Sequence, residues 1–236
     1  MSKRCFKRYQ KKTYVLCELC VRKHIKNMTE KRTEIAELGE FGLIDHLTKD
    51  NPTVNRSTVK SIGDDAAVID NGSSLTVIST DLLVEGIHFD LMYTPLKHLG
   101  YKAVVVNLSD IYAMNAQPKQ ITVSLAISNR FSVEALEEFY AGVYAACKHY
   151  KVDLVGGDTT SSPRGFVISI TAIGQAERES VVYRSGAKVG DLVCISGDLG
   201  ASYLGLQILE RENASIWRPP QYNPTWKKKN TRLAVF

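Results

Sequence analysis

Apolar residues recur along the 236-residue chain with two spacings, and segments of the two kinds alternate. A spacing of three or four residues predicts a helix, and a short β-branched or aliphatic run between polar residues predicts a strand. The helix after Ser132 has well-defined ends, because this serine can cap it and Lys148 and His149 suit the negative end of its dipole. The expected helices cover residues 35–47, 95–114, 132–149 and 199–210. One short strand is expected to end at residue 69, and five more are expected at 75–79, 120–127, 152–155, 166–173 and 191–196.

This alternation of strands and helices is typical of the α/β fold class. It ends at Asn213, after which three prolines, two tryptophans and the basic run Lys227–Lys229 follow without a period. The first 27 residues also differ in composition from the rest, being rich in Lys and Arg. We therefore expect a folded body between residues 28 and 212, with a disordered N-terminal extension and an unmatched C-terminal tail.

The net charge of +5 is unevenly distributed. Residues 1–27 hold nine Lys or Arg and one Glu, and residues 213–236 hold five Lys or Arg and no acid. This leaves 16 bases and 24 acids for residues 28–212, whose net charge is −8. An acidic body argues against specific nucleic-acid binding, although a non-catalytic dimerisation or nucleic-acid-binding module that uses the basic ends is an alternative of a different class.

The chain contains no run of about 18 apolar residues, so we expect no membrane span. Its N-terminus is basic, but the best apolar stretch there, Tyr14–Val21, is short and contains Glu18, unlike a secretory signal. We expect a cytoplasmic protein.

The five cysteines are too few and too scattered for a disulfide framework. By residue type and spacing, Cys17 and Cys20 could form a zinc site with the nearby Cys5 and His24. No second Cys-x-x-Cys pair is present, so reduced thiols on a disordered arm are the favoured interpretation.

Four polar motifs stand where packing does not require them, and three of them adjoin apolar strands, so we expect their carboxylates at strand ends. Asn107 and Asp110 are three residues apart and share the helix face that should be buried. Converging carboxylates repel one another unless a cation lies among them, and oxygen ligands without His or Cys favour Mg²⁺ over zinc. The motifs are Gly63-Asp64-Asp65, Ser79-Thr80-Asp81, Asn107-Leu108-Ser109-Asp110 and Gly156-Gly157-Asp158-Thr159-Thr160.

Several Mg²⁺ ions in one site usually serve nucleotide phosphates, whose charge they neutralise during phosphoryl transfer. Gly156 and Gly157 would let the backbone approach a phosphate closely. The chain has neither a Walker motif nor a kinase Gly-rich loop, so an ATP site here would belong to another fold.

The order and spacing of these motifs resemble the thiamine-monophosphate kinase family, within the aminoimidazole-ribonucleotide synthetase-like superfamily. The resemblance covers about residues 35–212 and implies a mixed α/β sheet with flanking helices that pairs with a second copy, a homodimer. It implies an N-terminal domain over residues 28–175, with the start of a second α/β domain over 176–212. The matching motifs are Gly39-Glu-Phe-Gly-Leu-Ile44, Ile62-Gly-Asp-Asp-Ala-Ala67, Ile78-Ser-Thr-Asp-Leu82, Val84-Glu-Gly-Ile-His-Phe89, Tyr101-Lys-Ala, Asn107-Leu-Ser-Asp-Ile-Tyr-Ala-Met114, Val155-Gly-Gly-Asp-Thr-Thr160 and Arg184-Ser-Gly-Ala-Lys-Val-Gly-Asp191.

The resemblance implies direct transfer of the γ-phosphoryl group of ATP to thiamine monophosphate, with Mg²⁺ and without a general base, because the acceptor phosphate is already ionised. Family metal-binding positions correspond to Asp65, Ser79, Thr80, Asp81, Asp110 and Asp158. Nucleotide-contacting positions correspond to Gly157, Asp158, Arg184 and Tyr140, and His88 corresponds to a residue beside the substrate.

The sequence departs from the family after Glu212, where the motifs of a second domain are expected and the unmatched tail stands instead. This departure predicts a truncated chain that turns over thiamine monophosphate poorly. Another ATP-dependent enzyme of the same superfamily is the alternative within the enzyme class.

Overall fold

The computed structural model describes residues 33–216, with side chains described up to Glu212. The expectations for residues 1–27 and for the tail, including the zinc hypothesis at Cys17 and Cys20, lie outside the described residues. The chain divides into two compact units at Pro52. In the first, helix α2 (Ile35–Thr48) is kinked at Gly39, whose φ of 66° interrupts the helical backbone. No residue of α2 is buried.

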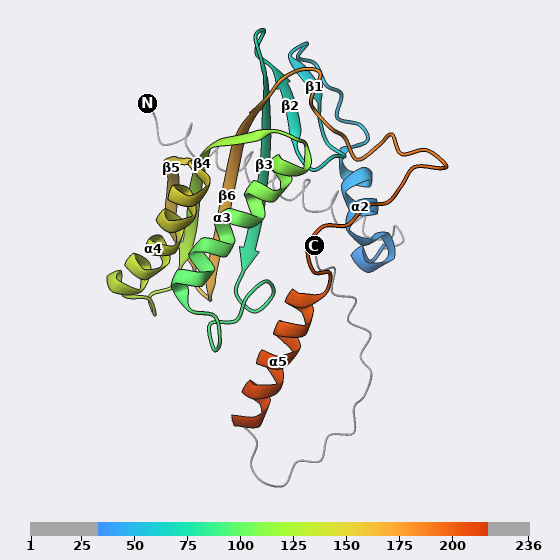
Figure 1. Ribbon diagram of the computed structural model, residues 1–236. Coiled ribbons are helices and arrows are strands. Elements are labelled where there is room, and N and C mark those ends of the chain that lie inside the picture. Colours follow the sequence, from blue (N-terminus) through green and yellow to red (C-terminus); the bar gives the residue numbers. More distant parts are fainter. Residues whose placement is uncertain (1–32, 217–236) are drawn as a thin grey trace, which may run out of the picture. The chain divides into compact units, whose positions relative to one another are not determined.

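The second unit is built on a six-stranded mixed sheet with strand order β1-β2-β3-β6-β4-β5 (Figure 1). Only β4 and β5 pair in parallel, and α4 makes the crossover between them. All other neighbours pair antiparallel. The strands are β1 (Thr58–Lys60), β2 (Ala67–Asp70), β3 (Leu75–Val84), β4 (Gln117–Ile127), β5 (Asp153–Ser161) and β6 (Phe166–Ala176).

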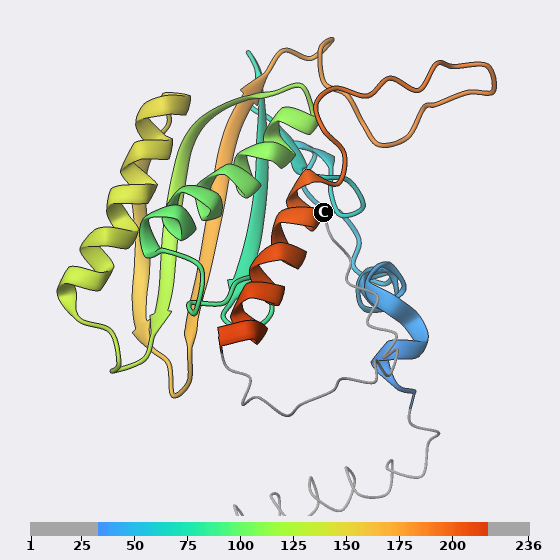
Figure 2. The ribbon, with the colours of Figure 1, turned by 60° about the horizontal axis from the view of Figure 1, so that its bottom comes forward.

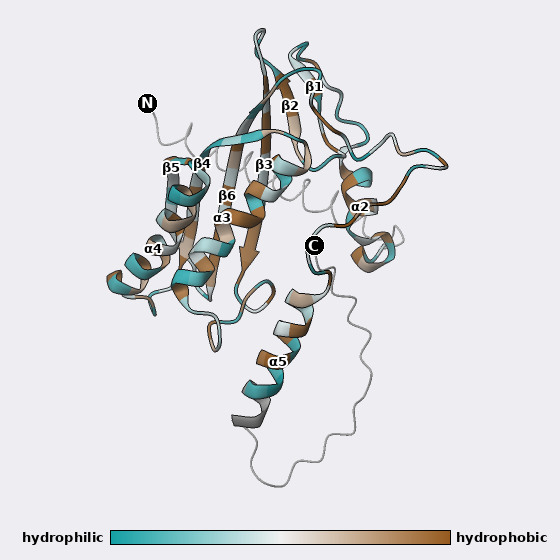
Figure 3. Cartoon of the chain, viewed as in Figure 1, coloured by the Kyte–Doolittle hydropathy of each residue, from teal (hydrophilic) through white to brown (hydrophobic). Residues whose placement is uncertain are grey.

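Two helices, α3 (Leu96–Ala113) and α4 (Val133–Tyr150), cover one face of this sheet (Figure 2). Every second residue of β6, from Phe166 to Ala172, is buried on that face and packs with Phe139 and Val143 of α4. The central strands are accordingly among the most hydrophobic parts of the chain (Figure 3). The residues between them, such as Thr80 and Thr171, lie on the opposite face and are partly or fully exposed.

The ends of the helices follow from local chemistry. Ser132 caps α4 as expected, because its hydroxyl accepts a hydrogen bond from the Ala135 N–H, and Lys148 and His149 lie in the last turn. Helix α3 ends before Asn115, which adopts a left-handed conformation (φ 53°) that Asn tolerates better than most residues. The last helix, α5 (Ala201–Ile216), exposes the apolar side chains of Leu204 and Ile208.

Helices α3 and α4 approach so closely that glycine is required on both. A Cβ at Gly100 of α3 would lie 2.0 Å from the backbone oxygen of Phe139. A Cβ at Gly142 of α4 would lie 1.9 Å from the backbone oxygen of Lys97. Backbone-to-backbone contact therefore fixes the spacing of the two helices, and with it the depth of the core beneath them.

Three secondary-structure expectations were wrong. Strand β3 continues to Val84 and β5 to Ser161, so Asp81 and Asp158 lie within strands rather than at strand ends. The reason is pairing: β6 is hydrogen-bonded to β3 along its whole length, and β4 is paired with β5 up to Ser161. Residues 191–196 form no strand in the described part of the chain, and the side chains of Leu192 and Val193 are almost fully exposed there. Pro118 lies within β4, beside a register shift.

The close helix contact predicts that Gly142→Ala destabilises the chain, although alanine is the better helix former. The added methyl group must push the helices apart, so we expect a loss of about 1–3 kcal/mol in urea unfolding. Gly205→Ala in α5 is the matched control, because no atom lies within 4 Å of its added Cβ. A Gly142→Ala variant as stable as the Gly205→Ala variant would contradict the close-contact explanation.

Candidate active site

A buried serine connects two carboxylate motifs that are far apart in the sequence. The Ser79 side chain of β3 points toward α3, where its hydroxyl oxygen lies 2.7 Å from Oδ2 of Asp110. The same hydroxyl lies 3.1 Å from the backbone oxygen of Asp65. Since Asp65 lies in the loop before β2, the hydroxyl brings a loop, a strand and a helix together. Asp65, Ser79 and Asp110, all expected metal-binding positions, therefore form one cluster.

Asn107 fixes the fourth member, Asp81, beside this cluster. Its fully buried amide donates from Nδ2 to the Ala103 oxygen (2.9 Å) one turn earlier in α3. Its Oδ1 accepts the backbone N–H of Asp81 (2.9 Å). Asn107 thus spans from helix to strand. The expected burial is confirmed for Asn107, whereas Asp110 is partly exposed.

The cluster carries more negative charge than its surroundings balance. Burial raises the pKa of the Asp81 carboxyl above its usual range, and the charge of Asp110 raises it further. Burial likewise raises the pKa of Asp110, against the hydrogen bond from Ser79, and the charge of Asp65 adds to the increase. A cation between these carboxylates would favour their ionised forms.

Arg184 lies beside the cluster from a distant part of the chain. Its guanidinium forms an ion pair with the Asp65 carboxylate, and its backbone N–H donates to Oδ1 of Asp64 (3.1 Å). Lys60 lies 3.6 Å from the other carboxylate oxygen of Asp64. Asp64 is a residue that the sequence interpretation left without a role, although it adjoins Asp65.

His88 occupies the loop after β3. Its Nδ1 accepts the Val84 N–H (3.0 Å), and its backbone oxygen accepts a hydrogen bond from Nζ of Lys102 in α3 (2.9 Å). Burial lowers the pKa of the Lys102 ammonium group. His88 lowers the pKa of Asp81, which opposes the increase caused by burial. Lys102 therefore anchors the loop that carries His88.

The remaining expected residues lie elsewhere. Thr80 lies on the opposite face of β3, where the hydroxyl of Thr171 donates to it (3.2 Å). Asp158 of β5 is paired with Ser124 of β4, and this register places its side chain on the same face as that of Thr80. Residue 157 must be glycine, because a Cβ there would lie 1.7 Å from the backbone oxygen of Val123. Tyr140 lies on α4 and lines a pocket with Tyr144.

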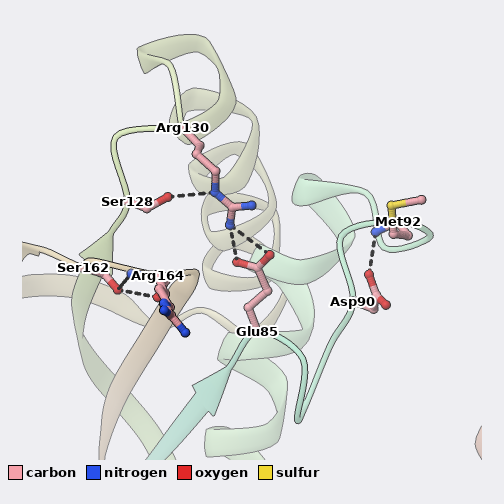
Figure 4. Close-up of polar contacts among 7 residues, drawn as sticks. All are labelled: Glu85, Asp90, Met92, Ser128, Arg130, Ser162 and Arg164. Carbon is pink, nitrogen blue, oxygen red and sulfur yellow. Dashed lines mark hydrogen bonds and ion pairs between the residues drawn. The ribbon is translucent and has the colours of Figure 1, made fainter.

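The structure thus brings together Asp65, Ser79, Asp81, Asp110 and Arg184, and leaves Thr80, Asp158 and Tyr140 apart. Within residues 33–212, no group of three or more His, Cys, Asp and Glu side chains is arranged to hold a metal ion. One charged group was missed altogether: Glu85 and Arg130 pair at the end of the sheet (Figure 4), and their separation of 45 residues leaves no sequence signal.

Comparison with known proteins agrees with this architecture. Residues 63–176 match the family model "AIR synthase related protein, N-terminal domain". The thiamine-monophosphate kinase of Aquifex aeolicus is 41% identical over 178 residues, which are 75% of this chain and 55% of the relative. The Bacillus subtilis thiamine-monophosphate kinase is 38% identical over 74% of this chain and 54% of the relative. Residues 63–176 are thus similar to an AIR synthase related N-terminal domain.

Solved structures show a similar fold. One described as "AaThiL complexed with AMPPCP and TMP" aligns with a TM-score of 0.69 and 38% identity, over 82% of this chain and 57% of that one. The thiamine-monophosphate kinase of Stenotrophomonas maltophilia K279a aligns with a TM-score of 0.56 and 33% identity, over 74% and 54%. The expected α/β fold and the resemblance to thiamine-monophosphate kinases are confirmed. The chain spans about half the length of the curated relatives it matches.

The carboxylate cluster predicts an unusual stability change. Asp110→Asn keeps the acceptor for Ser79 and removes one charge, so we expect it to stabilise the chain at pH 7 without divalent cations. Because Asp110 is half-exposed, solvent screening limits the gain to about 1 kcal/mol. The wild-type carboxyl has a raised pKa when folded, so the wild type loses stability as pH rises above its ordinary value of 3.8.

Urea unfolding in a chelating buffer from pH 4 to 8 measures this effect. The advantage of Asp110→Asn should grow with pH over the lower part of that range. Asp158→Asn, at an exposed carboxylate whose Oδ1 accepts the Thr159 N–H, is the control and should change stability by less than about 0.5 kcal/mol. A destabilised Asp110→Asn chain at pH 7 would show that the cluster is not a site of uncompensated charge.

Proposed function

We propose that the chain is part of an enzyme that transfers the γ-phosphoryl group of ATP to thiamine monophosphate, giving thiamine diphosphate. The proposal is supported by 34–41% identity to thiamine-monophosphate kinases across several bacteria. It is supported by the relative solved with AMPPCP and TMP, at 38% identity. The carboxylate cluster carries the proposal, because these four side chains come from motifs with the family's order and converge in space.

Mg²⁺ fits the donor set of this cluster. Carboxylate and hydroxyl oxygens are the ligands that Mg²⁺ prefers. Burial, followed by the charge of a neighbouring carboxylate, raises the pKa values of Asp81 and Asp110, and a bound cation would favour their ionised forms. We propose that Asp65, Asp81 and Asp110 hold Mg²⁺, which would neutralise phosphate charge when bound.

The other residues would position these groups. Ser79 orients Asp110, and Asn107 fixes the backbone of Asp81. We propose that Arg184, already beside Asp65, contacts the nucleotide phosphates, and that His88 lies beside the thiamine monophosphate. The acceptor phosphate is ionised at neutral pH, so in-line positioning and charge neutralisation supply the catalysis.

Four further positions are part of the proposal on the resemblance alone. Thr80 and Asp158 are proposed metal-binding positions, although their side chains lie on the sheet face opposite to Asp81. Gly157 and Tyr140 are proposed to contact the nucleotide. A second metal position near β5 would account for Asp158.

We also propose a homodimer that pairs through the open sheet face. That face carries the partly exposed Ile78 and Ile173 and the exposed Leu82 among Thr and Ser side chains, and α3 and α4 lie on the other face. The described residues contain no helix able to cross a membrane. The cytoplasm is the proposed location, since the reaction consumes ATP.

Calorimetric titration of the full chain with ATP tests the site. We expect ATP to bind only with Mg²⁺, and Asp81→Asn and Asp110→Asn to weaken binding by about 1–3 kcal/mol, because each removes a charged contact. Asp153→Asn, at an exposed carboxylate of the same sheet, is the control and should bind as the wild type does.

Product analysis then tests the acceptor. Because this chain is expected to turn over thiamine monophosphate poorly, we expect slow formation of thiamine diphosphate, and no product from aminoimidazole-type substrates of the superfamily. Binding of ATP that ignores both Mg²⁺ and the Asp110→Asn substitution would contradict the proposed site. Phosphorylation of another acceptor instead would favour the alternative, another ATP-dependent enzyme of the same superfamily.

A further inference from the structure

A cavity of about 570 Å³ lies at one end of the sheet, away from the carboxylate cluster. Three loops meet there: the loop after β3, the loop between β4 and α4, and the turn between β5 and β6 (Figure 4). Glu85 lies four residues beyond Asp81, which corresponds to about 13 Å along an extended strand. The lining includes Glu85, Gly86, Asp90, Arg130, Arg164 and Gly165.

Arg130 is held in place on one side of this cavity. Its NH2 group lies 3.2 Å from each carboxylate oxygen of Glu85. Its Nε donates to the hydroxyl of Ser128 (3.2 Å). A guanidinium has five N–H donors, so further donors of Arg130 remain for a ligand after these contacts. The Arg130 side chain is more than half exposed, so these donors are accessible.

Arg164 supplies a second guanidinium from the turn before β6. Ser162 shapes this turn, because its hydroxyl donates to the Arg164 oxygen (2.6 Å) and lies 3.3 Å from the Arg164 N–H. The Arg164 guanidinium makes no hydrogen bond or ion pair within residues 33–212, while its backbone is fixed. Its charge is therefore uncompensated in a cavity that it lines with Arg130.

The glycine beside Arg164 keeps this geometry open. Gly165 has a φ of +71°, and a Cβ there would lie 3.2 Å from Oε2 of Glu85. A larger residue would crowd the carboxylate that orients Arg130. The turn therefore leaves room for both the ion pair and the cavity.

We propose that this cavity binds the phosphate group of a small molecule between Arg130 and Arg164. Two guanidinium groups with free donors match the oxygens of a phosphate, and one of them has no counter-charge. Glu85 and Asp90 limit the positive potential of the cavity, so the site would select by donor geometry more than by net charge. The inference uses no residue of the carboxylate cluster and stands independently of the proposed function.

Titration with inorganic phosphate at low ionic strength tests the proposal on the full chain. Amide NMR shifts should report saturable binding at Gly86 and Gly165. Arg164→Ala should weaken phosphate binding at least tenfold and leave Mg²⁺-dependent ATP binding unchanged, which separates this site from the nucleotide site. Arg178→Ala is the matched control, since this exposed arginine pairs with Asp70 near the start of the sheet and should not affect those shifts.

Glu85→Gln provides a test of opposite sign. Removing this carboxylate removes the negative charge that competes for Arg130, so phosphate should bind several-fold more tightly. Because a misfolded variant would not gain affinity for phosphate, tighter binding cannot be explained by loss of the fold. Equal phosphate affinity in wild type, Arg164→Ala and Glu85→Gln, or acetate binding as tightly as phosphate, would overturn the proposal.

Discussion

The hydrogen bonds of one buried amide determine how α3 lies on the sheet. Asn107 is the one fully buried side chain with a polar group among the described residues, and both of its polar ends have partners. An apolar residue of similar size would leave the Asp81 N–H without an acceptor at the point where helix and strand meet. This contact places Asp110, about one turn later in α3, within hydrogen-bond distance of Ser79. The carboxylate cluster is therefore a consequence of how α3 is attached to β3.

The pleat of the sheet explains which polar motifs converge. Ser79 and Asp81 share a face with the core because residues two apart in a strand point the same way. Thr80 lies between them and faces away, and Asp158 follows Ser124 to that same outer side. Strand parity thus places Ser79 and Asp81 on the covered face of the sheet and Thr80 and Asp158 on the open face.

The helices and most strands could be predicted from the sequence, because hydrophobic spacing and the Ser132 cap are local signals. The lengths of β3 and β5 could not, since pairing with β6 and β4 extends them through polar and Gly-rich residues that resemble loops. The contacts of Asp65 with Ser79 and Arg184 required the tertiary structure as well, although family motifs identified these residues. The ion pair of Glu85 and Arg130 required the tertiary structure too, because Arg130 lies in none of the motifs and 45 residues separate the two.

The two edges of the sheet are unequal, and this has a consequence for solubility. One edge strand, β1, is three residues long, whereas the other, β5, has nine residues and pairs only through β4 among the described strands. A long edge with unpaired N–H and C=O groups is a template on which another strand can add. The exposed carboxylates of Asp153 and Asp158 along β5 oppose such addition by like-charge repulsion. These acids therefore protect the chain from edge-to-edge aggregation, and neutralising both at once removes that protection.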